Sequence, residues 1–180
     1  IKKTNKVKIP VIIDEAYYGF YKFSYIKFIK KFDNLVILRT FSKASGLAGL
    51  RAGYIVTGKK ISQNLFKYRP MYEISSIACL AIEYVMKNKS VSRNHISKIN
   101  LSKKYLSKEL TKMNYNFLNT HGNFFHIDLG GNKKKFETIL KNNKILIRKG
   151  PGVKGFENYL RFSLGSIIQM KKVIKLLKLL

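Results

Sequence analysis

The chain has 180 residues, 46% of them hydrophobic and 25% charged, so it can bury a core and is not a wholly disordered protein. Its one cysteine, Cys79, excludes an internal disulfide and a cysteine-based metal site, and its apolar helical surroundings predict a buried thiol. No apolar run is long enough to span a bilayer, and no signal peptide is recognisable, so we expect a cytoplasmic protein.

The charge is strongly positive, with 36 Lys and Arg residues against 9 Asp and Glu residues and a net charge of +27. Residues 1–90 hold 17 basic and 5 acidic residues, and residues 91–180 hold 19 and 4. A nucleic-acid site usually concentrates its basic residues, whereas this even spread is typical of solvated helix faces. We therefore favour a small-molecule partner, and a basic binding module without catalytic activity stays as an alternative.

The first predicted element is a strand over residues 9–13, because its β-branched apolar residues suit a buried parallel strand. It ends in Asp14, and Tyr17 follows. In open α/β sheets, ligands bind beyond the carboxyl ends of the strands, so both side chains are candidate site residues. Taken alone, Asp14 is better explained as a residue that caps the next segment.

Residues 18–33 combine aromatic side chains with lysines. Their spacing predicts a loop and a short helix over residues 26–32, with the rings packed on the sheet. The same mixture of residues can stack on nucleic-acid bases, but the spacing favours core packing.

A second strand, residues 35–38, leads into the most informative stretch of the chain. Lys43 follows it, next to the hydroxyl residues Thr40 and Ser42, and a loop with several glycines brings Arg51 back eight residues later. Hydroxyl groups and a guanidinium suit a phosphate dianion, and a lysine in such a place can form a Schiff base. Pyridoxal phosphate is the cofactor that needs both features.

This stretch, from Thr40 to Arg51, resembles the cofactor-lysine motif of class I and II (fold-type I) aminotransferases, most closely the histidinol-phosphate aminotransferase branch. The resemblance implies that Lys43 forms the covalent link to pyridoxal phosphate and acts as the catalytic residue. It also implies that Thr40, Ser42 and Arg51 bind the cofactor phosphate.

The Asp-Glu-Ala-Tyr segment at residues 14–17 matches the same family. By this resemblance Asp14 pairs with the protonated pyridine nitrogen, and Tyr17 donates a hydrogen bond to the phenolic oxygen of the cofactor. A carboxylate at that place keeps the ring protonated, which makes it a better electron sink.

Further along the chain, the pattern predicts a strand over residues 51–57, a helix over residues 61–68 and another helix from about residue 74. Residues 89–93 are polar and mark the expected domain boundary. An amphipathic helix follows over residues 94–113, with lysines opposite its apolar face.

The last part of the chain predicts a small sheet with two more helices. We expect helices over residues 133–141 and from residue 167. The expected strands cover residues 115–118, 123–129, 145–148 and 159–165. The histidines have no acidic or cysteine companions at metal-ligand spacing, so we predict no metal site.

Two arginines in this part are candidate substrate residues. The segment around Arg161 matches the carboxyl-terminal signature of the same family, which implies that Arg161 binds the substrate α-carboxylate. A similarly placed residue in histidinol-phosphate aminotransferases implies that Arg148 binds the substrate phosphate, although Arg148 could also be one surface cation among many.

We therefore predict an α/β fold. Residues 1–88 would form the carboxyl-terminal part of the three-layer, cofactor-binding large domain, and residues 89–180 a small α+β domain. The resemblance covers only the second half of a typical family member, so we expect a portion of a longer enzyme or a decayed remnant. Alone it would bind cofactor poorly and be inactive.

The expected function is transfer of an amino group from an amino acid or amino-phosphate donor to a 2-oxo acid, in a protein that is a homodimer in its full-length form. A pyridoxal-phosphate-dependent decarboxylase of amino-acid phosphates on the same scaffold is the alternative within the family.

Overall fold

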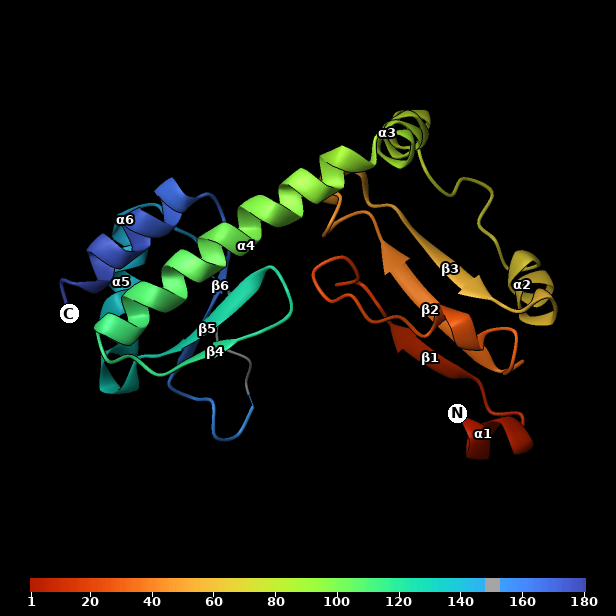
Figure 1. Cartoon of the computed structure of the whole chain (residues 1–180), viewed down its shortest axis with the longest axis horizontal. Coiled ribbons are helices and arrows are strands. Elements are labelled where there is room, and N and C mark those ends of the chain that lie inside the picture. Colours follow the sequence, from red (N-terminus) through yellow and green to blue (C-terminus); the bar gives the residue numbers. More distant parts are fainter. Residues whose placement is uncertain (148–152) are drawn as a thin grey trace. The chain divides into compact units, whose positions relative to one another are not determined.

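The structure, a computed structural model, describes residues 1–147 and 153–180 (Figure 1). It divides into two compact units, Ile1–His95 and Ile96–Leu180. Helix α4 (Lys89–Lys112) contributes to both units. The polar stretch 89–93, expected to separate the domains, is therefore helical and lies in the first turns of α4.

The first unit is built on a three-stranded sheet of β1 (Val11–Asp14), β2 (Leu35–Thr40) and β3 (Gly53–Thr57), in that order. Strand β1 pairs with β2 in parallel, and β2 pairs with β3 antiparallel. Leu35 and Ile37 are fully buried, as the apolar run predicts for a central strand. Both therefore anchor the core of this unit.

The other regular elements of this unit are helical. Within residues 26–32, where a helix was expected, the structure has a 3-10 turn, η1. The bounds of the helical elements are α1 (Lys2–Lys6), η1 (Ile26–Phe28), η2 (Ala48–Leu50), α2 (Lys59–Phe66) and α3 (Ser76–Lys87). Over the described residues, none of the helices is both long enough and apolar enough to cross a membrane.

Helix α3 begins at a true cap, since the hydroxyl of Ser75 accepts a hydrogen bond from the amide of Ala78. Its apolar face, however, is uncovered: the side chain of Leu80 is 67% exposed and Cys79 is exposed as well. The expectation of a buried thiol is therefore wrong. The residues form a helix, as their spacing predicts, but no segment that the structure describes packs over Leu80 and Cys79.

The second unit is an antiparallel sheet of β4 (Phe117–Asn119), β5 (Phe124–Asp128) and β6 (Tyr159–Ser163), in that order. Its helical elements are α4, η3 (Gly130–Asn132), α5 (Lys133–Asn142) and α6 (Ile167–Leu177). Alternate residues of β5 and β6 are buried, among them Phe125 and Leu160. Since side chains alternate across a strand, one face of the sheet packs against the helices and forms the core, and the other face is less covered (Figure 1).

The strand predicted over residues 145–148 is absent from its described part. Residues 145–147 follow α5 in irregular backbone, and the side chain of Leu146 is 94% exposed. A short apolar run predicts a strand only if a neighbouring strand pairs with it, and the sequence pattern does not show whether one does. Arg148 lies outside the described residues.

Candidate functional site

Two predicted site residues, Asp14 and Thr40, are the last residues of the neighbouring strands β1 and β2. Asp14 is the last residue of β1 and lies opposite Leu38 in the parallel register. Because every second residue of a strand faces the same side, Thr40, two residues beyond Leu38, lies on the same face of the sheet as Asp14. The carboxylate of Asp14 is exposed and accepts one hydrogen bond, 2.8 Å from the amide of Ala16.

The structure also brings Lys43 to Tyr17. Lys43 comes three residues after the end of β2, and its Nζ lies 5.6 Å from the centre of the Tyr17 ring. The turn that holds the lysine is fixed by its own backbone: the amide of Ser42 donates to the hydroxyl of Thr40 at 3.0 Å, and the amide of Gly46 donates to the Lys43 carbonyl at 3.1 Å. Residues 26 positions apart in sequence therefore share one site.

Arg51 ends the turn after the lysine in a left-handed conformation, with φ of 52°. Its Nη1 donates to the carbonyl of Ala48 at 2.9 Å. Arg51 as a whole is exposed. At Gly53 a Cβ would lie 2.7 Å from the carbonyl oxygen of Arg39, so β3 can approach β2 only with glycine at this position. The loop thus returns tightly to the sheet.

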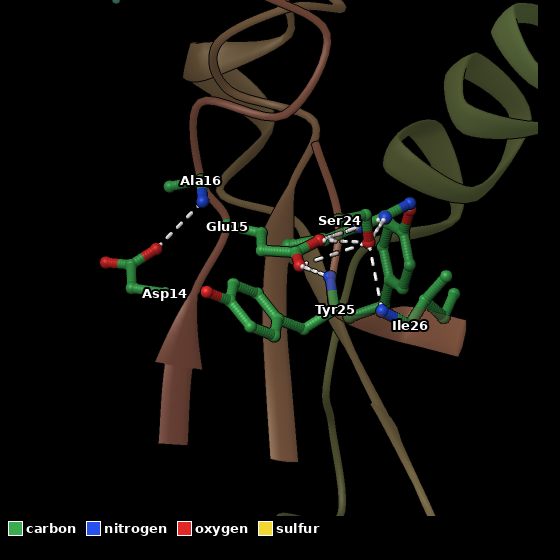
Figure 2. A network of polar contacts seen from close by, with 8 residues as sticks. Asp14, Glu15, Ala16, Ser24, Tyr25 and Ile26 are labelled. Atoms are coloured by element: carbon green, nitrogen blue, oxygen red, sulfur yellow. Dashed lines mark hydrogen bonds and ion pairs between the residues drawn. The ribbon is translucent and has the colours of Figure 1, made fainter. Parts of the chain in front are cut away.

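A buried polar network that was not predicted from the sequence lies next to this site (Figure 2). Figure 2 shows the carboxylate of Glu15 at its centre, whereas Asp14 points away from it. Glu15 Oε2 accepts from Arg39 Nε at 3.1 Å and Nη2 at 3.0 Å, and Oε1 accepts from the amide of Tyr25 at 2.7 Å. The hydroxyl of Ser24 lies 2.8 Å from both Oε2 and Arg39 Nη2.

Arg39 is held on several sides. Its guanidinium lies 3.6 Å from the centre of the Tyr18 ring, a cation–π contact, and its Nη1 is 3.5 Å from the Tyr54 hydroxyl. Burial lowers the pKa of Arg39, but hydrogen bonds to Tyr54 and Glu15 outweigh this, and the pKa is raised overall. In the sequence, Glu15 and Arg39 each come at the end of an apolar run that predicts a strand. Opposite charges at the ends of two neighbouring strands are the signal that could have revealed the network.

A cleft of about 200 Å³ adjoins Asp14 and opens between the strand end and the aromatic loop that follows it. Its lining residues are Ile13, Asp14, Glu15, Tyr17, Tyr18, Tyr21, Phe23 and Tyr25. Apolar rings with a few polar groups are typical of small-molecule sites. The aromatic residues of this loop therefore line a cleft as well as packing on one another.

Of the two candidate arginines, the structure describes Arg161, which lies in β6 of the second unit. Its guanidinium is 4.1 Å from the centre of the Phe124 ring, and His126 lies directly opposite it on β5. Burial, and then the charge of Arg161, lower the pKa of His126. Within residues 1–147 and 153–180, no three His, Cys, Asp or Glu side chains are grouped so that they could hold a metal ion.

The fold is that of an α/β protein. Asp14, Tyr17 and Lys43 form a candidate small-molecule site at the carboxyl ends of its strands β1 and β2. The chain belongs to the aminotransferase class I and II family, whose model matches residues 1–177. The predicted family and fold class are thereby confirmed.

Individual relatives agree with this assignment. "Histidinol-phosphate aminotransferase 1" of Carboxydothermus hydrogenoformans is 34% identical over 97% of this chain and 50% of its own length. Among solved structures, the histidinol-phosphate aminotransferase from Clostridium acetobutylicum superposes with a TM-score of 0.87 at 25% identity, over 98% of this chain and 55% of that one.

The enzyme from Sinorhizobium meliloti in complex with pyridoxal-5'-phosphate has a TM-score of 0.83 at 24% identity, over 95% of this chain and 50% of that one, and shows the shared fold. The chain spans about half the length of the curated relatives it matches.

Proposed function

We propose that this chain supplies the cofactor-lysine half of a pyridoxal-phosphate-dependent aminotransferase similar to histidinol-phosphate aminotransferase. The single observation that carries the proposal is the position of the Lys43 amine, 5.6 Å from the Tyr17 ring, where β1 and β2 end in a chain of the aminotransferase family. An amine beside an aromatic side chain, in a unit where Asp14 ends the neighbouring strand, suits a cofactor with an aldehyde, a ring nitrogen and a phenolic oxygen.

The groups present fit that cofactor. In the proposal, the amine of Lys43 holds it covalently, the hydroxyl of Tyr17 donates to its phenolic oxygen, and the carboxylate of Asp14 keeps its ring nitrogen protonated. When bound, pyridoxal phosphate supplies the electron sink for a carbanion. Lys43 then moves the proton between substrate and cofactor, since an amine in the site can act as a general base once released. The exposed carboxylate of Asp14 is available to pair with the ring nitrogen.

The cofactor phosphate would be bound by Ser42 and Arg51, with Thr40 in a supporting role. The hydroxyl of Thr40 already donates to the carbonyl of Ala52 at 3.2 Å and accepts from the amide of Ser42. A phosphate dianion accepts hydrogen bonds only, so Thr40 would have to release Ala52 to donate to it. The five donors of the Arg51 guanidinium are better suited, because they form a planar fork.

On the substrate side we propose that Arg161 binds the α-carboxylate and Arg148 the phosphate of a phosphorylated amino substrate. The partners are then a small amino donor and a 2-oxo acid, and the complete protein is a cytoplasmic homodimer. The names of the curated relatives support an aminotransferase that takes a phosphorylated amino substrate. We also propose that the 180-residue chain alone has little or no activity, because it spans only half of those relatives.

The proposal can be tested by joining the chain to the upstream half of the Carboxydothermus hydrogenoformans relative. The hybrid protein is incubated with pyridoxal phosphate and reduced with borohydride, and the pyridoxyl group is located by peptide mapping. We expect the label on Lys43, and its loss in Lys43→Ala. Lys27→Ala is a matched control, since the amine of Lys27 also lies near aromatic rings, 5.4 Å from Phe23 and 5.2 Å from Phe28.

Product analysis of the same hybrid tests the reaction. A keto acid together with nitrogen transferred to the 2-oxo acid is the expected result, and release of carbon dioxide would assign a decarboxylase instead. A label distributed over the surface lysines, unchanged by Lys43→Ala, would contradict the cofactor site itself.

A further inference from the structure

We propose that Glu15 and Arg39 form a positioning pair, which holds the ends of β1 and β2 in the register that the cofactor residues on the opposite face require. This inference rests on the proposed function, because it concerns the placement of Asp14 and Thr40. Glu15 borders the cleft described above, but the proposed roles give neither Glu15 nor Arg39 a contact with the cofactor or the substrate. Both act through the backbone to which the cofactor residues belong.

The geometry follows from the alternation of side chains along the strands. The amide of Glu15 donates to the carbonyl of Leu38 at 2.9 Å, so the β1–β2 ladder continues one residue past Asp14. Neighbouring residues of an extended strand point to opposite faces. Asp14 therefore faces one side and Glu15 the other, as Figure 2 shows. By the same rule, Thr40 and Arg39 on β2 face opposite sides.

The pair is largely buried and is hydrogen-bonded on several sides. The side chains of Glu15 and Arg39 are 6% and 11% exposed, and both guanidinium nitrogens that face Glu15 contact the same carboxylate oxygen. Ser24 and the amide of Tyr25 complete the shell around the carboxylate. A buried charge pair with this many fixed contacts resists sliding of one strand past the other.

The loop after β1 is held by the same pair. Ser24 and Tyr25 lie at the far end of the aromatic loop that begins at Tyr17, and Tyr18 stacks on the guanidinium of Arg39. The pair thus fixes both ends of the loop that carries Tyr17. One residue, Thr40, separates Arg39 from the segment Phe41–Lys43, so a shift of Arg39 moves the lysine turn as well.

The test compares three variants. Glu15→Gln keeps the shape of the side chain but leaves Arg39 without its countercharge. The double variant Glu15→Leu with Arg39→Met removes both charges and restores an apolar contact. Glu83→Gln makes the first change in the exposed Glu83–Lys87 pair and is the matched control. Amide hydrogen exchange and thermal unfolding are measured in the 180-residue chain, and labelling of Lys43 by pyridoxal phosphate in the hybrid protein.

We expect Glu15→Gln to raise the pyridoxal phosphate concentration for half-maximal labelling of Lys43 about tenfold and to speed exchange of the Ser42 amide, while Glu83→Gln does neither. The double variant should regain thermal stability without regaining labelling. Recovery of labelling together with stability would show a purely structural role and overturn the inference, as would normal labelling in Glu15→Gln.

Failure of the proposed function gives a different pattern. In that case the hybrid with the unaltered sequence is not labelled at Lys43 at all, and the inference falls with the function on which it rests. If the unaltered hybrid is labelled and the variants are not affected, only the positioning role is refuted.

Discussion

The two units of the chain differ in how completely they bury their apolar residues. The second unit buries side chains from α4, α5, α6, β5 and β6, including Leu106, Phe125, Phe136 and Leu177. The first unit has a small core around Phe32, Leu35 and Ile37 and leaves large apolar side chains exposed on α2 and α3. The proposed cofactor residues all lie in this less complete unit.

The comparison separates stability from chemistry. A sheet packed on helices needs no more than its own apolar faces to be stable, and the second unit has them. An extensive apolar surface such as that of α3 instead indicates a face normally covered by protein. The proposed cofactor residues are therefore concentrated where the chain is expected to depend on other protein, and the following predictions test this division.

The largest expected effect is on catalysis in the first unit. In the hybrid protein, Asp14→Ala should lower the rate of amino transfer by roughly 10³-fold or more, because an unprotonated ring is a poor electron sink. The unfolding temperature should hardly change, since Asp14 is exposed and has one local hydrogen bond. Steady-state kinetics measure the rate. Near-normal turnover in Asp14→Ala would show that this strand end does not hold the ring nitrogen.

Next comes stability in the second unit. Phe136 is fully buried on α5 and lies 6.1 Å, centre to centre, from the Phe162 ring. Phe136→Ala should destabilise this unit by about 3–5 kcal/mol through lost burial and the remaining cavity. Denaturant unfolding of the 180-residue chain measures the change. A loss below about 1 kcal/mol would mean that the core of the second unit is looser than its burial indicates.

A smaller effect is expected on the exposed face of α3. Leu80→Gln should change the free energy of unfolding by less than about 0.5 kcal/mol, because the side chain has little burial to lose. It should also reduce self-association of the isolated chain, as measured by sedimentation velocity. Strong destabilisation by Leu80→Gln would show that this face is covered in solution, which would remove the contrast between the units.

The smallest effect concerns pH. His126 has a pKa below its ordinary value, because of burial and the charge of Arg161, so the unfolded chain binds the proton more readily. The contribution of neutral His126 to the free energy of unfolding is therefore complete above the unfolded pKa of about 6.5. It is lost as the pH falls from there toward the lowered pKa of the folded chain. NMR titration of the imidazole measures the shift.

Arg161→Gln serves as the partner variant, since it removes the nearby charge and leaves the burial. It should move the His126 pKa upward, and an unchanged pKa would assign the whole shift to burial.

The sequence predicted the parts of the fold that depend on local pattern. The apolar run of β2, its ending before the lysine turn, and the strands β5 and β6 are found close to the expected residues. The same patterns could not show which faces have a partner. Cys79 was therefore expected to be buried but is exposed, and residues 145–147 were expected to form a strand but have irregular backbone.

Prediction of the site had a similar limit. The lysine turn and Asp14 could be recognised from consecutive residues, and the structure brings Lys43 to Tyr17. The Glu15–Arg39 pair depends on the register of two strands 24 residues apart, which no local pattern contains. The roles of the eight candidate residues stay predictions, and Arg148 among them lies outside the described residues.

The buried pair also restricts how the gene for this chain can change over generations. Losing either Glu15 or Arg39 first leaves a buried charge alone, at a cost of about 3–5 kcal/mol, a large share of the stability of a small domain. Selection for stability therefore favours keeping both residues or replacing both together. A copy free from selection would accumulate such single losses, and in this chain both members of the pair are still in place.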